Sequence, residues 1–465
     1  MSERNRSAWK LAIGIGVVYA VIAAVLISVG EVKKTITGHR GLAAWTSDAI
    51  LPDGYDYLNI AVCVSKGNGI AFDRTDPDFR RLVTNAHRKG WYRSERFNEP
   101  GWDRPRDIVD RAKPVPTASR APLYPVLLGA LFPVFGRNYV VPRVLNCILL
   151  GLTGVLVFLT GRRIRGTAAG LLAAAVLAAN TRMWAMGKQV LSEPLALTLV
   201  ALATYLFVRS LSEERQLRWL VLAALALAGG VLARHVLVLC VPVAAACVFI
   251  VQDRPFRRKL ARAALFLVVC SLPVLVWTVR NSVIAGMPVA LGTRGGFDLP
   301  ACYTRVCLES GGRWRRYSEQ PYAKEMAFAW RTRGEWGAYH VGRDIFRRLI
   351  RKNWPLIPGL VLVKLRRMLV PLPLEDFHDI ADIALIVLAL PGLVLLRREN
   401  AVFFVGAPVV GVLLGAALFH AMPRFRVPMF AGLAVLAGVT LAAVYARITS
   451  KRSTPQSAEP VDPDR

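Results

Sequence analysis

The sequence predicts an all-α integral membrane protein with about ten transmembrane helices and two large loops on the outer side of the membrane. Of its 465 residues 54% are hydrophobic, and the mean hydropathy is +0.40, a combination that is rare in soluble globular chains. The apolar residues also form long uncharged runs, such as residues 11–30 and 219–233. In a bilayer every backbone polar group must be paired within its own segment, so these runs are expected to be helices.

Ten segments are candidates for spans. The first follows the basic N-terminal residues 1–10, is about 20 residues long and ends without a small-residue cleavage site, so it is expected to be a retained signal anchor whose basic end lies in the cytoplasm. The ten candidates are residues 9–30, 139–160, 166–182, 194–209, 218–233, 236–252, 262–280, 378–396, 400–419 and 427–446.

An eleventh apolar segment, residues 121–136, contains three prolines and is shorter than the ~20 residues that a span needs. The distribution of basic residues decides how it is placed, because cytoplasmic loops are enriched in Lys and Arg. If 121–136 does not cross, all the basic loops lie in the cytoplasm. It is therefore predicted to be a juxtamembrane helix at the outer face. The same rule divides 219–251 into two short helices that meet at Arg234–His235. The basic loops are 161–166, 213–218, 253–262, 397–400 and 447–452.

The predicted organisation has six parts, with both ends of the chain in the cytoplasm. Residues 349–371 in the second outer loop alternate basic and apolar side chains, which is typical of an amphipathic helix at the membrane interface. The parts are the N-terminus and first span (1–30), the first outer loop with juxtamembrane helices (31–138), a bundle of six spans (139–280), the second outer loop (281–377), three spans (378–446) and a disordered cytoplasmic tail (447–465).

The net charge of +29 does not indicate nucleic-acid binding, because the basic residues lie in short loops between apolar runs. Cys302 and Cys307 share the second outer loop, where an oxidising compartment would permit a disulfide. The sequence leaves open whether that disulfide forms.

The charged residues predicted for the outer side suit a reaction on an anionic lipid. Arginines bind phosphate, bidentately where geometry allows, and a carboxylate can act as a general base. Structural alternatives exist for several of them: Asp53 can cap a helix, Glu193 stands before Pro194 at a helix start, and Arg234 and Arg280 can be anchors at helix ends. The carboxylates are Asp53, Asp56 and Glu193, and the cations are Arg120, Arg234, Arg280, Arg294, Arg424 and Arg426.

The order of these motifs resembles the GT-C superfamily of polyprenyl-phosphate-sugar-dependent glycosyltransferases. The likeness is to the branch that holds protein O-mannosyltransferases and lipid A aminoarabinose transferase (glycosyltransferase family 39), and it covers about residues 10–430. The motifs are PDGYDYLNIAVCVSKGNGI (52–70), RAPLYP (120–125), LSEPLAL (191–197), VRNSVIAG (279–286) and HAMPRFRVP (420–428).

The resemblance implies roles for individual residues. The family's acid in the first outer loop corresponds to Asp53, with Tyr57 four residues on and Gly67-Asn68-Gly69 further along, whereas Gly54 replaces a second acid. The acid before the fourth span corresponds to Glu193. The remaining matches are Arg120 to Pro125, Arg280–Asn281 with Gly295–Gly296, and Arg424 to Arg426. Segment 71–119 is longer and more charged than the family pattern.

The function implied is transfer of a sugar from a polyprenyl phosphate to an acceptor, with inversion, at the extracytoplasmic face of the inner membrane. Asp53 would be the general base, and Glu193 would orient the acceptor or position Asp53. Arg280, Arg424 and Arg426, with Arg120 or Arg234 as further candidates, would stabilise the charge on the departing phosphate. No extra acidic motif of the metal-dependent members is found, so no metal or other cofactor is expected. The acceptor can be a glycan, a lipid or a protein. The rival interpretations are a secondary transporter, which requires midplane charges and internal repeats, and a non-catalytic assembly protein, in which Asp53 and Glu193 need not converge.

Overall fold

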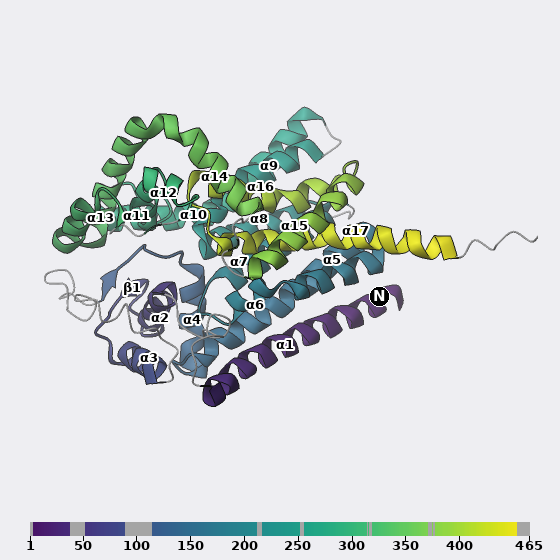
Figure 1. Cartoon of the computed structure of the whole chain (residues 1–465), viewed down its shortest axis with the longest axis horizontal. Helices are drawn as coiled ribbons and strands as arrows, with labels where there is room; N and C mark the ends of the chain where they lie inside the picture. Colours follow the sequence, from purple (N-terminus) through teal and green to yellow (C-terminus); the bar gives the residue numbers. More distant parts are fainter. Residues whose placement is uncertain are drawn as a thin grey trace, which may run out of the picture.

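The computed structural model describes residues 3–37, 52–88, 114–211, 216–251, 255–313, 315, 319–370, 374 and 377–452. Long helices run side by side through the molecule (Figure 1), and shorter elements gather at one end, which we call the loop end. The beginning of the first helix and the end of the last both lie at the opposite end. In the predicted tail 447–465, residues 447–452 are helical and not disordered. The tail from residue 453 and most of the charged part of segment 71–119 lie outside the described residues.

Within the described ranges, eight helices are long and apolar enough to cross a membrane. Large apolar side chains are exposed along them, among them Val276 and Val283, which are 64% and 75% exposed. Such a surface suits a lipid environment. The helices of this class are α1 (Glu3–Thr37), α5 (Val140–Ala179), α7 (Glu193–Ser210), α8 (Gln216–Ala233), α10 (Phe256–Ala285), α15 (His378–Leu395), α16 (Ala401–Leu418) and α17 (Phe430–Arg452).

Helix α5 contains two of the predicted spans. Its backbone leaves helical geometry at Arg165 and Gly166, where Gly166 has a φ of +84°. An added Cβ at Gly170 would overlap the carbonyl oxygen of Phe158, so the two halves fold back on each other. Arg165 contacts Glu399 at 2.6 Å. The two basic loops 161–166 and 397–400 therefore lie on the same side, as the charge rule predicts.

The break predicted at Arg234–His235 is confirmed. Helix α8 ends at Ala233, Arg234 is extended, and the chain continues through η3 (His235–Leu239) into α9 (Cys240–Val251). With α5 counted as two, the eight long helices correspond to nine of the predicted spans. His235–Val251, one of two shorter apolar helices together with Leu123–Phe135, corresponds to the tenth.

The first predicted outer loop forms a small unit at the loop end (Figure 1). Helix α2 (Pro52–Ser65) packs on α4 (Leu123–Phe135), the helix predicted to be juxtamembrane. Gly67 and Gly69 both have positive φ and let the chain turn from the end of α2 into the ribbon. That ribbon pairs β1 (Ala71–Phe72) with β2 (Val115–Pro116) in antiparallel register, and α3 (Pro77–Arg88) lies between them in sequence.

The second predicted outer loop is also helical. It contains α11 (Arg294–Ala301), α12 (Arg305–Glu309), α13 (Ala323–Asn353) and α14 (Ile357–Leu369). Gly296 and Gly342 meet where α11 and α13 cross, since an added Cβ on Gly342 would overlap the carbonyl of Gly296. The single amphipathic helix predicted over 349–371 is wrong. A 3-10 turn, η5 (Trp354–Leu356), contains Pro355 and separates α13 from α14.

Two further short elements shape the bundle at the loop end. Helix α6 (Thr181–Gly187) follows the N-cap Asn180, and η6 (Pro423–Met429) precedes α17. The 3-10 helix η6 contacts α7 and α16. Its residues are therefore held against the start of α7, where Glu193 lies.

Candidate functional site

Asp53 lies in the first turn of α2 between two arginines. Its Oδ1 is 2.7 Å from Nη2 of Arg120, and its Oδ2 is 2.7 Å from Nη1 of Arg424. Burial by itself would raise the pKa of this carboxyl, but Arg120, Arg424 and Arg294 outweigh it and hold the pKa well below its usual value. Asp53 is therefore ionised throughout the neutral range.

Glu193 begins α7 and is completely buried. Its Oε1 is 2.5 Å from Nη1 of Arg234 and 3.8 Å from Nε of Arg424. Neither carboxylate oxygen has a hydrogen bond among the described residues, although Oε1 is in ion contact with Arg234. A buried carboxylate oxygen without a hydrogen bond is costly, which makes Oε2 a candidate to accept a hydrogen bond from a substrate hydroxyl or amine.

Asp53 and Glu193 therefore converge, because both contact the guanidinium of Arg424. Asp56, one turn after Asp53, accepts from Nε and Nη2 of Arg120 at 2.9 and 2.7 Å. The result is an alternating series of three acids and three arginines, which we call the ion chain: Asp56, Arg120, Asp53, Arg424, Glu193 and Arg234.

Tyr57 flanks the ion chain. Its hydroxyl is 3.0 Å from Oγ of Ser192, its ring meets that of Tyr124 edge-on at 5.2 Å, and the guanidinium of Arg120 lies 5.8 Å from its ring centroid. Burial raises the pKa of the Tyr57 hydroxyl, so this side chain is neutral. It connects the first turn of α2 to the residue that precedes Glu193.

Arg294 and Arg280 are placed differently from each other. Arg294 is 40% exposed, lies 3.6 Å from Asp298, and contributes to the lowered pKa of Asp53. Arg280 donates from Nη1 to the carbonyl of Thr117 at 2.6 Å and from Nη2 to that of Ile70 at 2.8 Å. It therefore holds the β1–β2 ribbon, and the structure does not bring it to the ion chain as a phosphate ligand.

Arg426 also differs from the expectation. It is 1% exposed and contacts Asp379 and Asp382 through Nη1, at 2.7 and 2.8 Å. Its other nitrogens bond the carbonyls of Met368 and Arg367. Because its guanidinium nitrogens donate to these partners and its side chain is buried, Arg426 fixes η6. Of the predicted pair, only Arg424 reaches the ion chain.

Sequence reasoning missed Glu335 on α13. Its carboxylate accepts hydrogen bonds from Thr117 Oγ1, Ala118 N and Thr293 Oγ1. Burial raises the pKa of this carboxyl, and the charge of Asp56 raises it further. The three hydrogen bonds lower it, but by less than burial raises it. No local motif marks it, because its partners come from residues far away in the sequence.

The thiols of Cys302 and Cys307 are both free in the structure. Cys302 Sγ lies 3.6 Å from Nδ1 of His420 and 2.9 Å from the carbonyl of Asp298. In the part of the chain that the structure describes, no group of three or more His, Cys, Asp or Glu side chains is arranged to hold a metal ion. The metal-free expectation stays a prediction.

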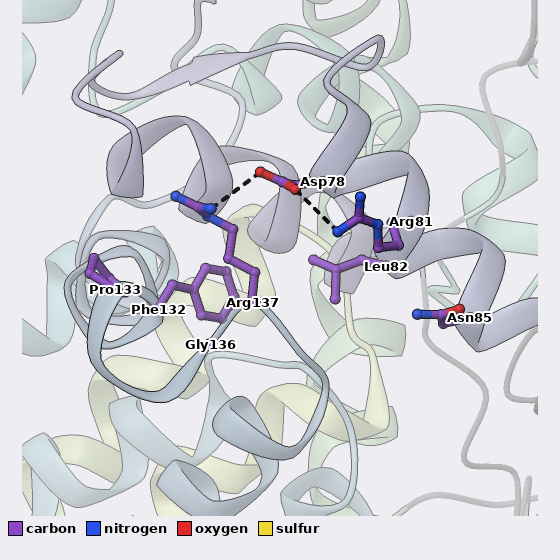
Figure 2. Close-up of a pocket in the computed structure, with 8 residues that line it drawn as sticks. All are labelled: Asp78, Arg81, Leu82, Asn85, Phe132, Pro133, Gly136 and Arg137. Carbon is purple, nitrogen blue, oxygen red and sulfur yellow. Dashed lines mark hydrogen bonds and ion pairs between the residues drawn. The ribbon is translucent and has the colours of Figure 1, made fainter.

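A cavity of about 420 Å³ lies elsewhere, between α3 and the C-terminal end of α4. Figure 2 shows Asp78 between Arg137 and Arg81 on its wall, with Phe132 at its side. Arg137 bonds Ser65, the last residue of α2, whereas Asp53 lies in the first turn of that helix. The cavity is thus separated from the ion chain by the length of α2. The ion chain is the candidate site because it pairs buried charges and also contains a buried carboxylate, Glu193, that makes no hydrogen bond among the described residues.

Comparison with known proteins gives a family match over part of the chain. Residues 119–277 match the dolichyl-phosphate-mannose-protein mannosyltransferase family. No curated protein matches the chain.

Several solved structures resemble the whole fold. The archaeal oligosaccharyltransferase AglB from Archaeoglobus fulgidus, in complex with an inhibitory peptide and a dolichol-phosphate, is 15% identical with a TM-score of 0.51, and the alignment covers 95% of this chain and 51% of that one. ArnT from Cupriavidus metallidurans, bound to undecaprenyl phosphate, is 13% identical with a TM-score of 0.41, covering 95% and 81%. The chain spans about half the length of the oligosaccharyltransferase that it matches. The resemblance to the GT-C glycosyltransferases is confirmed at the level of fold.

Proposed function

We propose that this chain, which has the fold of the GT-C glycosyltransferases, moves a sugar from a polyprenyl-phosphate donor to an acceptor at the extracytoplasmic face of the membrane. The observation that carries the proposal is the ion chain, in which arginines from three separate segments meet at Asp53 and Glu193. In such a cluster the arginines can bind the donor phosphate, and a carboxylate beside them can act as the general base.

The ion chain suggests how the donor activates the site. A lipid phosphate that enters between the arginines competes with the carboxylates for the same guanidinium groups. Arg424 is shared already, since it contacts both Asp53 and Glu193. A carboxylate that loses an arginine partner becomes a stronger base, so binding of the phosphate raises the basicity of Asp53 at the moment when the acceptor must be deprotonated.

In this mechanism Asp53 removes the proton from the acceptor hydroxyl or amine, which attacks the anomeric carbon opposite to the phosphate, with inversion. Glu193 Oε2, buried and without a hydrogen bond among the described residues, accepts a hydrogen bond that orients the acceptor. Arg424, Arg234 and Arg120 stabilise the charge that builds up on the departing lipid phosphate. No metal is required, because the arginines supply the positive charge.

The test compares Asp53→Asn with Asp56→Asn in purified, membrane-reconstituted protein given a panel of polyprenyl-phosphate sugars, with products identified by mass spectrometry. Both acids lie on α2 and both contact Arg120, so the pair is matched. Loss of the general base should reduce transfer by ~10²–10⁴ in Asp53→Asn. The loss should be much smaller in Asp56→Asn, in which Arg120 still contacts Asp53.

Normal transfer by Asp53→Asn would remove Asp53 from the mechanism. A wild-type protein that transfers no sugar from any lipid donor in the panel would contradict the proposed function itself.

A further inference from the structure

The two residues that precede Ser119 and Arg120 have every backbone polar group paired. Thr117 N donates to the Ile70 carbonyl at 3.2 Å, and Arg280 donates to the Thr117 carbonyl at 2.6 Å. Ala118 N donates to Glu335 at 3.0 Å, and its carbonyl accepts from Thr293 N at 3.1 Å. A short segment held on all sides in this way sets the direction in which the chain leaves it.

Glu335 is the only side chain described that bonds both this segment and the start of α11. Its Oε2 accepts from Thr117 Oγ1 at 2.6 Å, and its Oε1 accepts from Thr293 Oγ1 at 2.5 Å as well as from Ala118 N. Thr293 immediately precedes Arg294. One carboxylate on α13 thus connects the segment that presents Arg120, which contacts Asp53 at 2.7 Å, with the segment that presents Arg294, whose charge lowers the pKa of Asp53.

We propose that Glu335 is a positioning residue that holds Arg120 and Arg294 toward Asp53, so that α13, in the second predicted outer loop, controls the geometry of the site. The effect on sugar transfer rests on the proposed function, whereas the effect on the Thr117–Ala118 segment does not. Glu335 itself is given no contact with substrate.

The variant Glu335→Gln tests this with little change in volume. The amide oxygen can still accept from Ala118 N, but the amide nitrogen must face a threonine hydroxyl that already exchanges hydrogen bonds with Ser119. The matched control is Glu325→Gln on the same helix, where the carboxylate is 46% exposed and contacts Arg348. A second variant, Thr293→Val, keeps the Glu335 charge and removes the bond to α11.

The first measurement is hydrogen–deuterium exchange on the full chain. Hydrogen bonds to charged groups are among the stronger ones in proteins, so peptides that contain Ala118 should exchange at least roughly tenfold faster in Glu335→Gln than in wild type. Peptides at the start of α11 should follow in both Glu335→Gln and Thr293→Val, while Glu325→Gln matches wild type. Exchange at Ala118 and Thr293 that is unchanged in Glu335→Gln and Thr293→Val would overturn the proposal.

The second measurement is the pH profile of transfer. The charged groups that act on Glu335 are Asp56 from α2 and Arg280 from α10. Burial raises the pKa of Glu335, and the arginines lower that of Asp53. The activity of the wild type should therefore fall on the acid side at a higher pH than the ordinary pKa of a glutamate would give, and separately from any titration of Asp53. This acid limb of the profile should be missing in Glu335→Gln and present in Glu325→Gln.

If Glu335→Gln keeps the acid limb in its pH profile of transfer, the positioning role is refuted, even if the transfer rate falls. A variant that only loses stability would transfer more slowly at every pH but would keep the limb. If wild type transfers no sugar, the proposed function fails while the exchange result still decides whether Glu335 holds the segment.

Discussion

Two acids and two arginines form a buried group in contact with η6, and this group tests what fixes the position of Arg424. Its members are Asp379, Asp382, Arg182 and Arg426. Asp382 is completely buried, and its Oδ2 accepts from Arg182 Nε at 2.6 Å and from Arg426 Nη1 at 2.8 Å, while its Oδ1 accepts from Asn180 at 3.2 Å. Asp379 contacts the same two arginines at 2.7 Å. The group is therefore charge-balanced.

Replacing Asp382 with Asn leaves two buried arginines with one carboxylate. Removing one partner of a buried ion pair costs about 3–5 kcal/mol, because the remaining charge is uncompensated. We expect Asp382→Asn to lower the free energy of unfolding by an amount in this range. It should also reduce sugar transfer, since Arg426 fixes the turn from which Arg424 reaches Asp53.

The double variant Asp382→Asn with Arg182→Gln restores the balance and leaves Asp379 paired with Arg426 at 2.7 Å. It should be more stable than Asp382→Asn alone. The assay is thermal unfolding in detergent, followed by intrinsic fluorescence, with transfer measured on the same samples. A double variant that is less stable than the single one, or a single variant within about 1 kcal/mol of wild type, would refute this reasoning.

Two further predictions concern packing and pH. Gly392→Ala should destabilise the bundle by about 1–3 kcal/mol, because the added Cβ would overlap the carbonyl of Leu436 where α15 packs on α17. The control is Gly406→Ala, where no atom lies within 4 Å of the added carbon. Equal unfolding midpoints for the two variants would contradict the close packing. Lys364 is completely buried against the ring of Tyr303, and burial lowers its pKa. Wild type should therefore gain stability as the pH rises through that lowered pKa toward the ordinary value of about 10.4, and Lys364→Met, measured by unfolding at a series of pH values, should lack the gain.

The membrane-spanning helices could be predicted from the sequence, because hydropathy and the position of basic residues act locally. Arg234 was expected to separate two short helices, and it does so by adopting an extended conformation between α8 and η3. For residues 121–136, which form α4 packed on α2, the charge rule predicts a place at the outer face, and that placement stays a prediction. Both inferences depend on the cost of exposing backbone or charge to lipid.

The partners of individual charges could not be predicted in the same way. Arg424 and Arg426 are separated by one residue in the same basic motif, but Arg424 contacts Asp53 while Arg426 contacts Asp379 and Asp382. Which of the two faces the site depends on the turn of η6, and a resemblance by motif treats them alike. Arg280 matched its motif and nevertheless bonds two carbonyls of the ribbon.

The ion chain also has a consequence for the order in which the protein is made. Asp53 lies close to the beginning of the sequence, and Arg424 lies close to its end. During synthesis Asp53 reaches the membrane long before Arg424, its second arginine partner, has been made. Glu193 is likewise synthesised before both of its partners, Arg234 and Arg424. A chain interrupted before η6 would carry these acids without their full complement of arginines, so the site is complete only after η6 has been synthesised.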